Sequence, residues 1–385
     1  MHPKELLEDA PGVIWPALMP CWCLPLIGSA GGDWLCLMIT DQGNSAQIIQ
    51  WYHGGGDWIP WGNDLAEAII YDVIRHRLPG PKRSHAIAAV NHSPTDDFDL
   101  CPLYQWAKKF MPQPVVLAIE SDASADELAI VLLEHKIAEV AVRCDQVQAA
   151  LDHPLANALT PEVANNLQIS WNDANEWIFD AARMPGEIAE RISLTHAFQH
   201  SPLQQDWDCV LADCEHISKL APELAWPWDI MGYAHERAGE LAAAIDAYRQ
   251  GVEASVYTDQ SVRLRTHWML NEAPKFSAAR LKRLSPETIA ASDYLTHLCS
   301  TKARQSREEL TQYWLGEAQL ASARGDALHQ QKCLLNAGWD LGAEPMGRYA
   351  SIMEQITQCA EKSGSAALAS IVSTHRVCLQ NRYRI

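Results

Sequence analysis

Positive charge is nearly missing from the start of this 385-residue chain, because Lys4 is the one basic side chain among the first 74 residues and faces nine carboxylates. A surface this acidic repels the phosphates of nucleic acids and speeds the encounter with a basic protein. Acidity also serves solubility, so charge alone leaves both interpretations open. The deficit is local, since residues 276–385 carry 13 basic against 10 acidic side chains. We therefore expect a protein partner and no nucleic acid.

Long apolar runs are absent as well. No stretch of about 18 apolar residues occurs, and the segment from Met1 to Pro11 lacks the basic and then apolar order of a secretory signal. The sequence predicts a soluble, cytoplasmic protein that has no membrane partner. Eleven cysteines are scattered from Cys21 to Cys378 without the paired C-x2-4-C spacing of a zinc site, which predicts free thiols and no metal.

Recognisable catalytic motifs are missing too. The glycine-rich stretches around Asp33 and Asp57 have no Lys-Ser or Lys-Thr after them, which argues against a phosphate-binding loop. His53 and Asp57 could act as a base and its orienting group, but no G-x-S-x-G nucleophile pattern accompanies them. We expect no catalytic residue and no cofactor, and we keep a hydrolase built on His53 and Asp57 as a remote alternative.

The N-terminal region does contain a strand pattern with a repeated tetrapeptide, Gly-Gly-Asp-Trp, at 31–34 and again at 55–58. Residues 34–39 and 46–52 predict two strands that a turn at 41–44 joins into a hairpin. Residues 60–62, Pro-Trp-Gly, are expected to break the pattern. Asn63 or Asp64 can then cap a helix that runs to about His76.

Residues 84–152 alternate strand-like and helix-like segments. We predict strands at 85–90, 115–119 and 137–142. We predict helices at 103–110 and 125–135, the second capped by Ser124 with Glu127 three residues later. This alternation predicts a small α/β extension beside the first sheet.

From about residue 161 the periodicity is helical, and residues 207–256 resemble the tetratricopeptide repeat, a 34-residue helical hairpin. Small and aromatic residues have the spacing of the repeat family's motif. The departures are His235, where Tyr is usual, and Val256, where Pro is usual. A weaker echo begins at Trp314. The resemblance implies packing positions rather than ligand contacts. These positions are Trp207, Pro222, Trp228, Gly232, Gly239, Ala244 and Tyr248.

The segment from Leu26 to Leu37, which holds the first Gly-Gly-Asp-Trp, looks like the central strand motif of the SUKH superfamily. Residues 48–53 resemble the next strand of that superfamily, and residues 65–70 its closing helix. SUKH proteins have an α+β fold and include yeast cell-wall synthesis regulators and bacterial immunity proteins. The resemblance implies a non-enzymatic module that grips a partner protein, often a nuclease or another toxin.

Tryptophans and carboxylates of this region are the candidate partner contacts. Trp is enriched at binding hot spots, and Asp can pair with Arg or Lys of a partner. Trp34 begins a strand and is expected in the core instead. The expected partner-binding residues are Trp51, His53, Asp57, Trp58, Trp61, Asp33 and Asp64.

Together these features predict an α+β N-terminal module followed by an α-helical, solenoid-like repeat region. The expected domains are a SUKH-like module at 1–80, a small α/β extension at 81–155 and a tetratricopeptide-like region at 156–385. The expected function is non-enzymatic protein binding of the immunity or regulatory type, with the acidic module holding a basic toxin or a regulatory protein. The alternative is a housekeeping scaffold that docks peptides in its helical groove. Asn, Lys or Arg at the exposed positions of the first helices would favour it, whereas those positions include Asp229, His235 and Glu236.

Overall fold

The computed structural model describes residues 8–16, 19–28, 32–39, 46–52, 58–79, 101–158, 162, 165, 166, 168, 186, 190, 207–254, 273, 275–300, 307–339 and 346–384. The predicted strand at 85–90, the predicted turn at 41–44, and both His53 and Asp57 lie outside these residues.

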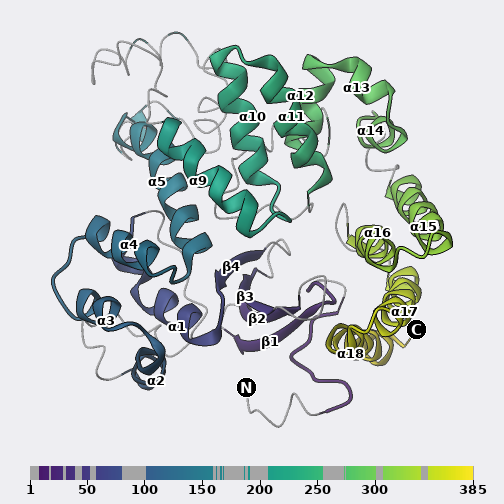
Figure 1. Ribbon diagram of the computed structural model, residues 1–385, viewed down its shortest axis with the longest axis horizontal. Helices are drawn as coiled ribbons and strands as arrows, with labels where there is room; N and C mark the ends of the chain where they lie inside the picture. Colours follow the sequence, from purple (N-terminus) through teal and green to yellow (C-terminus); the bar gives the residue numbers. More distant parts are fainter. Residues whose placement is uncertain are drawn as a thin grey trace.

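Four antiparallel strands make one sheet in the order β1-β2-β3-β4 (Figure 1). β2 and β3 pair from Trp34 opposite Trp51 to Ile39 opposite Ala46, which confirms the predicted hairpin. The segment 60–62, expected to break the strand pattern, instead forms the end of β4. Pro60 is tolerated there because β4 is an edge strand whose register with β3 shifts nearby. The strands are β1 (Cys23–Gly28), β2 (Trp34–Ile39), β3 (Ala46–Trp51) and β4 (Trp58–Gly62).

The helix α1 (Leu65–Ile74) follows β4 and continues into a 3-10 turn, η2 (Arg75–Arg77). Asp64 caps α1, as predicted, and its carboxylate accepts a hydrogen bond from the Glu67 backbone N–H at 2.9 Å. The Trp61 ring of β4 meets the Tyr71 ring of α1 edge to face, with 4.7 Å between centroids. An aromatic contact therefore fixes α1 against the edge of the sheet.

Helices and the turns between them make up residues 101–158, so the expected α/β extension has no strand in this part of the chain. The predicted helices at 103–110 and 125–135 are confirmed, and Ser124 and Glu127 form the predicted capping box. The strands predicted at 115–119 and 137–142 are wrong, because the first is helical and the second runs into a helix. The elements are α2 (Pro102–Ala107), η5 (Lys108–Phe110), α3 (Gln113–Ile119), α4 (Ala125–Glu134) and α5 (Glu139–Ala158).

The described part of the chain after residue 206 is a succession of helices. Three of their pairs form hairpins, namely α10–α11, α15–α16 and α17–α18. These hairpins turn at Gly239, Gly325 and Gly364, whose φ angles of 79°, 73° and 81° are left-handed and favour glycine. The helices are α9 (Trp207–Leu220), α10 (Trp226–Ala238), α11 (Leu241–Glu253), α12 (Phe276–Leu284), α13 (Pro286–Ala290), α14 (Asp293–Leu298), α15 (Arg307–Ala323), α16 (Ala327–Trp339), α17 (Met346–Lys362) and α18 (Ala366–Tyr383).

In Figure 1 the helices follow one another around the sheet, from α1–α5 on one side, through α9–α12, to α15–α18 on the other. The last helix returns to the start of the chain at three points, which we call the closing contact. His375 Nε2 lies 2.7 Å from the Cys23 carbonyl oxygen, Cys378 donates to Pro11, and Arg382 donates to the Gly12 carbonyl at 3.0 Å. Buried apolar side chains form one continuous cluster from Met19 to Leu379. The sheet therefore lies inside a helical arc that ends against its first strand.

Candidate functional site

The tryptophans predicted to contact a partner lie in the core. Trp51, Trp58 and Trp61 are wholly buried, and the Trp15 ring packs 6.4 Å from the Trp51 ring. β4 is buried along its whole length. In this fold the three indoles are therefore core side chains and are not available to a partner, which corrects the expectation from their positions near loop ends.

The carboxylates predicted to contact a partner lie at different places in the fold. Asp64 is exposed, but its side chain is already engaged in capping α1. Asp33 is half-buried next to the start of β2. His53 and Asp57 lie outside the described residues, so the proposed base and its orienting group stay a prediction. Within the described residues, these candidates do not assemble into one site.

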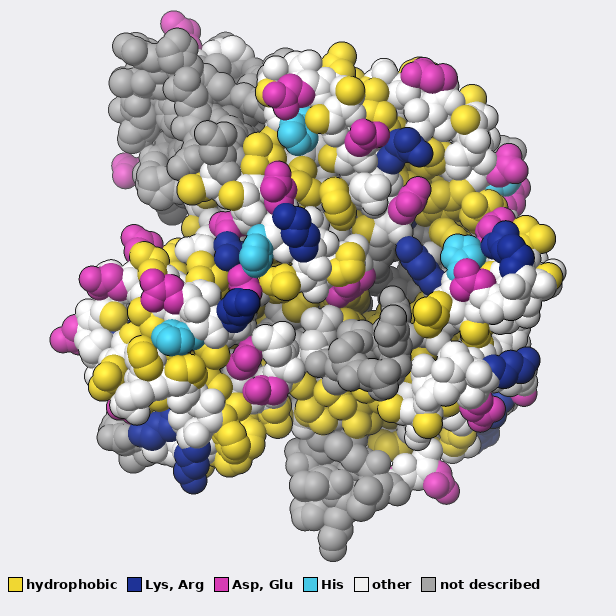
Figure 2. Space-filling model, viewed as in Figure 1, with side chains coloured by type: hydrophobic (Ala, Val, Ile, Leu, Met, Phe, Trp, Pro, Cys, Tyr) yellow, Lys and Arg dark blue, Asp and Glu magenta, His cyan; other side chains and the backbone are white. Residues whose placement is uncertain are grey.

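A different surface exposes large apolar side chains. Nine such side chains are exposed among the described residues, and four of them lie on consecutive elements. Trp106 and Phe110, with 39% and 61% of their surfaces exposed, stand on α2 and η5 with their rings 5.0 Å apart. Leu117 on α3 and Ile130 on α4 are 59% and 52% exposed. We call these four residues the α2–α4 surface; Figure 2 shows hydrophobic and acidic side chains next to one another over these helices.

Helical spacing could have identified the aromatic part of the α2–α4 surface. Tyr104 and Ala107 are buried, whereas Trp106 and Phe110, four residues apart, share the opposite side. The sequence predicts a helix here but not its exposed side, because the apolar residues within 103–110 do not show which of them has a neighbouring element to pack against.

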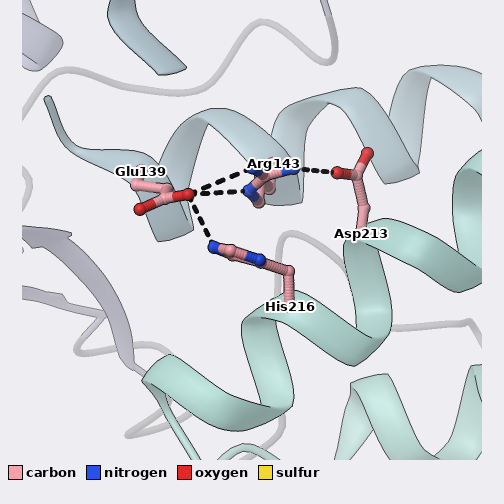
Figure 3. A network of polar contacts seen from close by, with 4 residues as sticks. All are labelled: Glu139, Arg143, Asp213 and His216. Atoms are coloured by element: carbon pink, nitrogen blue, oxygen red, sulfur yellow. Dashed lines mark hydrogen bonds and ion pairs between the residues drawn. The ribbon is translucent and has the colours of Figure 1, made fainter. Parts of the chain in front are cut away.

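A polar network joins α5 to α9 (Figure 3). Arg143 donates through Nη2 and Nε to Glu139 Oε1 at 3.0 and 3.2 Å, and its Nη1 lies 2.5 Å from Asp213 Oδ1. His216 Nε2 lies 2.7 Å from the same Glu139 oxygen. Burial raises the pKa of the Asp213 carboxyl, while Arg143 opposes that shift. Every side chain of the network contacts another member, so its evident effect is to clamp α5 against α9.

A second charged group is buried between α1, α5 and β4. The Arg75 guanidinium lies 4.8 Å above the Trp61 ring, and its Nε is 3.5 Å from Asp145 Oδ2. Tyr71 donates its hydroxyl hydrogen bond to the same carboxylate oxygen. The cation–π contact and the ion pair offset part of the cost of removing this charge from water, since the guanidinium nitrogens of Arg75 have no hydrogen-bond partner among the described residues. This cluster lies in the core, where no substrate could reach it without a rearrangement.

Three of the seven positions expected to pack in the tetratricopeptide-like unit are buried, namely Gly232, Ala244 and Tyr248. Ala244 and Tyr248 are wholly buried, and a Cβ on Gly232 would lie 2.5 Å from Tyr248 Cδ1. Trp228 is half-buried. Pro222 and Gly239 are exposed in the connections before α10 and after it, and the side chain of Trp207 lies outside the described residues. The small residue Gly232 thus permits the close approach of α10 and α11.

The three polar residues expected to be exposed in a peptide groove are engaged within the fold. Asp229 is buried and accepts a hydrogen bond from Ser277 of α12, and burial raises its pKa to about 7. Glu236 accepts hydrogen bonds from Tyr248, at 2.9 Å, and from Arg280. His235 Nδ1 lies 2.7 Å from Glu240 Oε2. The expectation that Asp229 is exposed is therefore wrong.

Several buried thiols are held in environments that oppose ionisation. All eleven cysteines are free. Burial raises the pKa of Cys21 to about 12 and that of Cys23 well above its ordinary value. Within the described residues, no three His, Cys, Asp or Glu side chains are grouped closely enough to hold a metal ion. In that same part of the chain, every helix is too short or too polar to span a membrane.

Comparisons with protein-family models, with curated proteins and with solved structures found no match.

Proposed function

We propose that this chain is a non-enzymatic protein-binding protein of the immunity or regulatory type, and that its partner binds at the α2–α4 surface. The observation that carries this proposal is the exposed pair of Trp106 and Phe110, whose rings lie 5.0 Å apart, followed by exposed Leu117 and Ile130 on the next two helices. Exposed apolar side chains that lie next to one another, as Trp106 and Phe110 do, mark protein-interaction sites, and Trp is prominent at binding hot spots.

The proposal moves the binding surface away from the Gly-Gly-Asp-Trp region. Trp51, Trp58 and Trp61 are buried, whereas Trp106 is exposed. Support for the class of function comes from the SUKH resemblance, since a strand hairpin followed by a helix is the order that this resemblance implies. The acidity of the first 74 residues also supports a basic partner, because opposite charge steers association over long distances.

An affinity-capture experiment with the full chain tests the proposal. Lysate from the source cell, or from a strain that encodes candidate toxins, is passed over the unchanged chain, the double variant Trp106→Ala/Phe110→Ala and the control variant Leu320→Ala/Leu328→Ala. Leu320 and Leu328 are also exposed but lie on α15 and α16. We expect a specific protein to be retained by the unchanged chain and the control and lost from the double variant. The same proteins on all three, or none on any, would contradict the proposal.

A housekeeping scaffold that docks peptides is the second candidate. The three helical hairpins that turn at left-handed glycines favour it, because stacked hairpins of this kind form extended binding surfaces. It differs from the first candidate in where binding occurs. Ligand retained equally by the unchanged chain and by Trp106→Ala/Phe110→Ala, but lost from variants in α10–α16, would favour the scaffold.

A further inference from the structure

The solvent side of α4 combines two carboxylates with one apolar side chain. Leu128, Ala129 and Leu132 are the buried side of α4, whereas Asp126, Ile130 and Glu134 are exposed. A spacing of four residues places these three on successive turns of the same side. At a rise of 1.5 Å per residue, Asp126 and Glu134 stand about 12 Å apart along the helix, with Ile130 midway.

The two carboxylates are available for an external partner. Glu120 nearby is paired with Lys108 at 3.0 Å, and Glu127 accepts hydrogen bonds from Ser124 in the capping box. In contrast, the described part of the chain offers no ion pair or hydrogen bond to the carboxylates of Asp126 and Glu134. The exposed side of α4 therefore presents two unneutralised negative charges on either side of a half-exposed isoleucine.

Charge decides which class of occupant suits this side of α4. Nucleic acids and anionic lipid surfaces would be repelled by Asp126 and Glu134. An acidic protein segment would be repelled as well. A basic segment with an apolar side chain between its charges would gain two ion pairs and cover Ile130, which combines electrostatic steering with apolar burial.

We propose that α4 docks a basic amphipathic helix of a partner protein, in which two Lys or Arg side chains about 12 Å apart flank one apolar residue. A pattern of Lys-x3-Leu-x3-Lys meets this requirement, because it repeats the spacing of Asp126, Ile130 and Glu134. The inference rests on the proposed function and adds to it the chemistry of the partner. The helix-in-groove mode of recognition uses anchors at the same spacing.

Fluorescence anisotropy with two synthetic helical peptides tests the inference on the full chain. One peptide carries Lys-x3-Leu-x3-Lys on one face, and the other carries Glu-x3-Leu-x3-Glu in an otherwise identical sequence. The proteins are the unchanged chain, Asp126→Lys/Glu134→Lys, the milder Asp126→Asn/Glu134→Gln, and the control Asp246→Lys/Glu361→Lys. The control alters the net charge equally at exposed positions on α11 and α17. Circular dichroism checks that each variant is folded.

We expect the Lys peptide to bind the unchanged chain and the control alike. Its affinity should fall at least tenfold in Asp126→Asn/Glu134→Gln and further in Asp126→Lys/Glu134→Lys, and the latter variant should gain binding of the Glu peptide. Equal affinity of the Lys peptide for all four proteins would overturn the inference. So would an equal loss in the control, because that loss would report net charge alone.

The two proposals fail in distinguishable ways. If the α4 variants leave peptide binding unchanged while Trp106→Ala/Phe110→Ala still abolishes capture of a natural partner, the basic helix is wrong and the protein-binding function stands. If no protein is captured at all, the proposed function fails whatever the peptides show.

Discussion

Asp229 is a carboxyl group in surroundings that favour its neutral form. It is buried between α10 and α12, where burial raises its pKa from 3.8 to about 7, opposed by the Ser277 hydrogen bond and by Lys275. Lys275 in turn donates to the Val252 carbonyl and the Tyr294 hydroxyl, both at 2.9 Å. The charge that opposes the neutral form of Asp229 is therefore itself held in place by α11 and α14, which couples the protonation of Asp229 to how these helices pack.

The raised pKa of Asp229 predicts how stability changes with pH. Because the folded pKa lies above the unfolded one, its contribution to stability is fully present below pH 3.8 and is lost as the pH rises through 7. The variant Asp229→Asn does not titrate and should lack this loss. As the pH rises from 3.8 to 7, its free energy of unfolding should therefore increase relative to that of the unchanged chain, by at most roughly 4 kcal/mol. Urea unfolding at several pH values measures the difference, and a difference that does not vary with pH would contradict the assignment.

Gly232 is predicted to be required by packing rather than by backbone conformation. A Cβ at this position would lie 2.5 Å from two ring carbons of Tyr248, which is itself wholly buried. Gly232→Ala should therefore destabilise the chain by about 1–3 kcal/mol. Gly316 on α15 is the matched control, since a Cβ there meets nothing within 4 Å. Gly316→Ala should be neutral or stabilising in thermal unfolding. Equal effects of both substitutions would show that the Tyr248 contact is not the cause.

The sequence correctly predicted which residues cap helices, but not which tryptophans are buried. Asp64 and Ser124 cap their helices as expected, because capping depends on atoms three residues away. Trp61 and Trp106 have the same side chain but opposite environments, because α1 covers Trp61 and no described helix encloses Trp106. That difference arises from elements distant in sequence, which local spacing cannot reveal.

At the scale of elements, the closing contact holds α18 against the first strand. His375 is wholly buried, and burial lowers its pKa from 6.5 to about 4 while its Nε2 bonds to the Cys23 carbonyl. The neutral imidazole donates that hydrogen bond. The partner residue is 352 positions away, so the contact joins the two ends of the chain.

Acid should loosen the closing contact. The pKa of His375 is lower in the folded state than in the unfolded state. The contribution of His375 to the stability of the fold is therefore present above pH 6.5 and is lost as the pH falls through 4. Amide protection in α18, corrected for intrinsic exchange, should fall across this range. His375→Gln, which keeps a side-chain donor but does not titrate there, should remove the pH dependence. An unchanged pH dependence in that variant would assign the effect to other groups.

The clamp between α5 and α9 is predicted to depend on Arg143. Its side chain is mostly buried and pairs with Glu139 and Asp213, so Arg143→Ala should cost about 1–3 kcal/mol by leaving both carboxylates without this donor. Arg249→Ala is the control, because Arg249 is over half exposed and lies 4.0 Å from Asp246. An exposed pair of this kind contributes about 0.5 kcal/mol or less. Equal changes in melting temperature would argue against the clamp.

The type of element, helix or strand, was predicted correctly where the apolar periodicity extends over many residues. It was predicted wrongly where the apolar run is short. The helices of residues 207–253 follow the predicted periodicity. The run Val115–Ile119 was predicted as a strand but is helical, because a short buried apolar run has the same signal in either state. The proline at the first turn of α3 is the local feature that favours a helix over a strand here. The closing contact left no local signal at all.

At the scale of the whole molecule, the sheet occupies the inner side of the helical arc (Figure 1). The hydrogen bond from Gln47 of β3 to Glu223, which precedes α10, adds a tie at 3.2 Å between the sheet and the middle of the arc. Strands of the sheet are thus hydrogen-bonded to the later helical region at Glu223 and at His375. The exposed apolar side chains of α2–α4 take no part in these contacts between the sheet and the later helices. We therefore place the partner at α2–α4.

Hydrogen exchange of the full chain with and without its captured partner tests the central claim most directly. We predict new protection in residues 102–134, above all around Trp106 and Ile130, with little change in α10–α18. Protection confined to α10–α18, with residues 102–134 exchanging as in the free chain, would contradict the account.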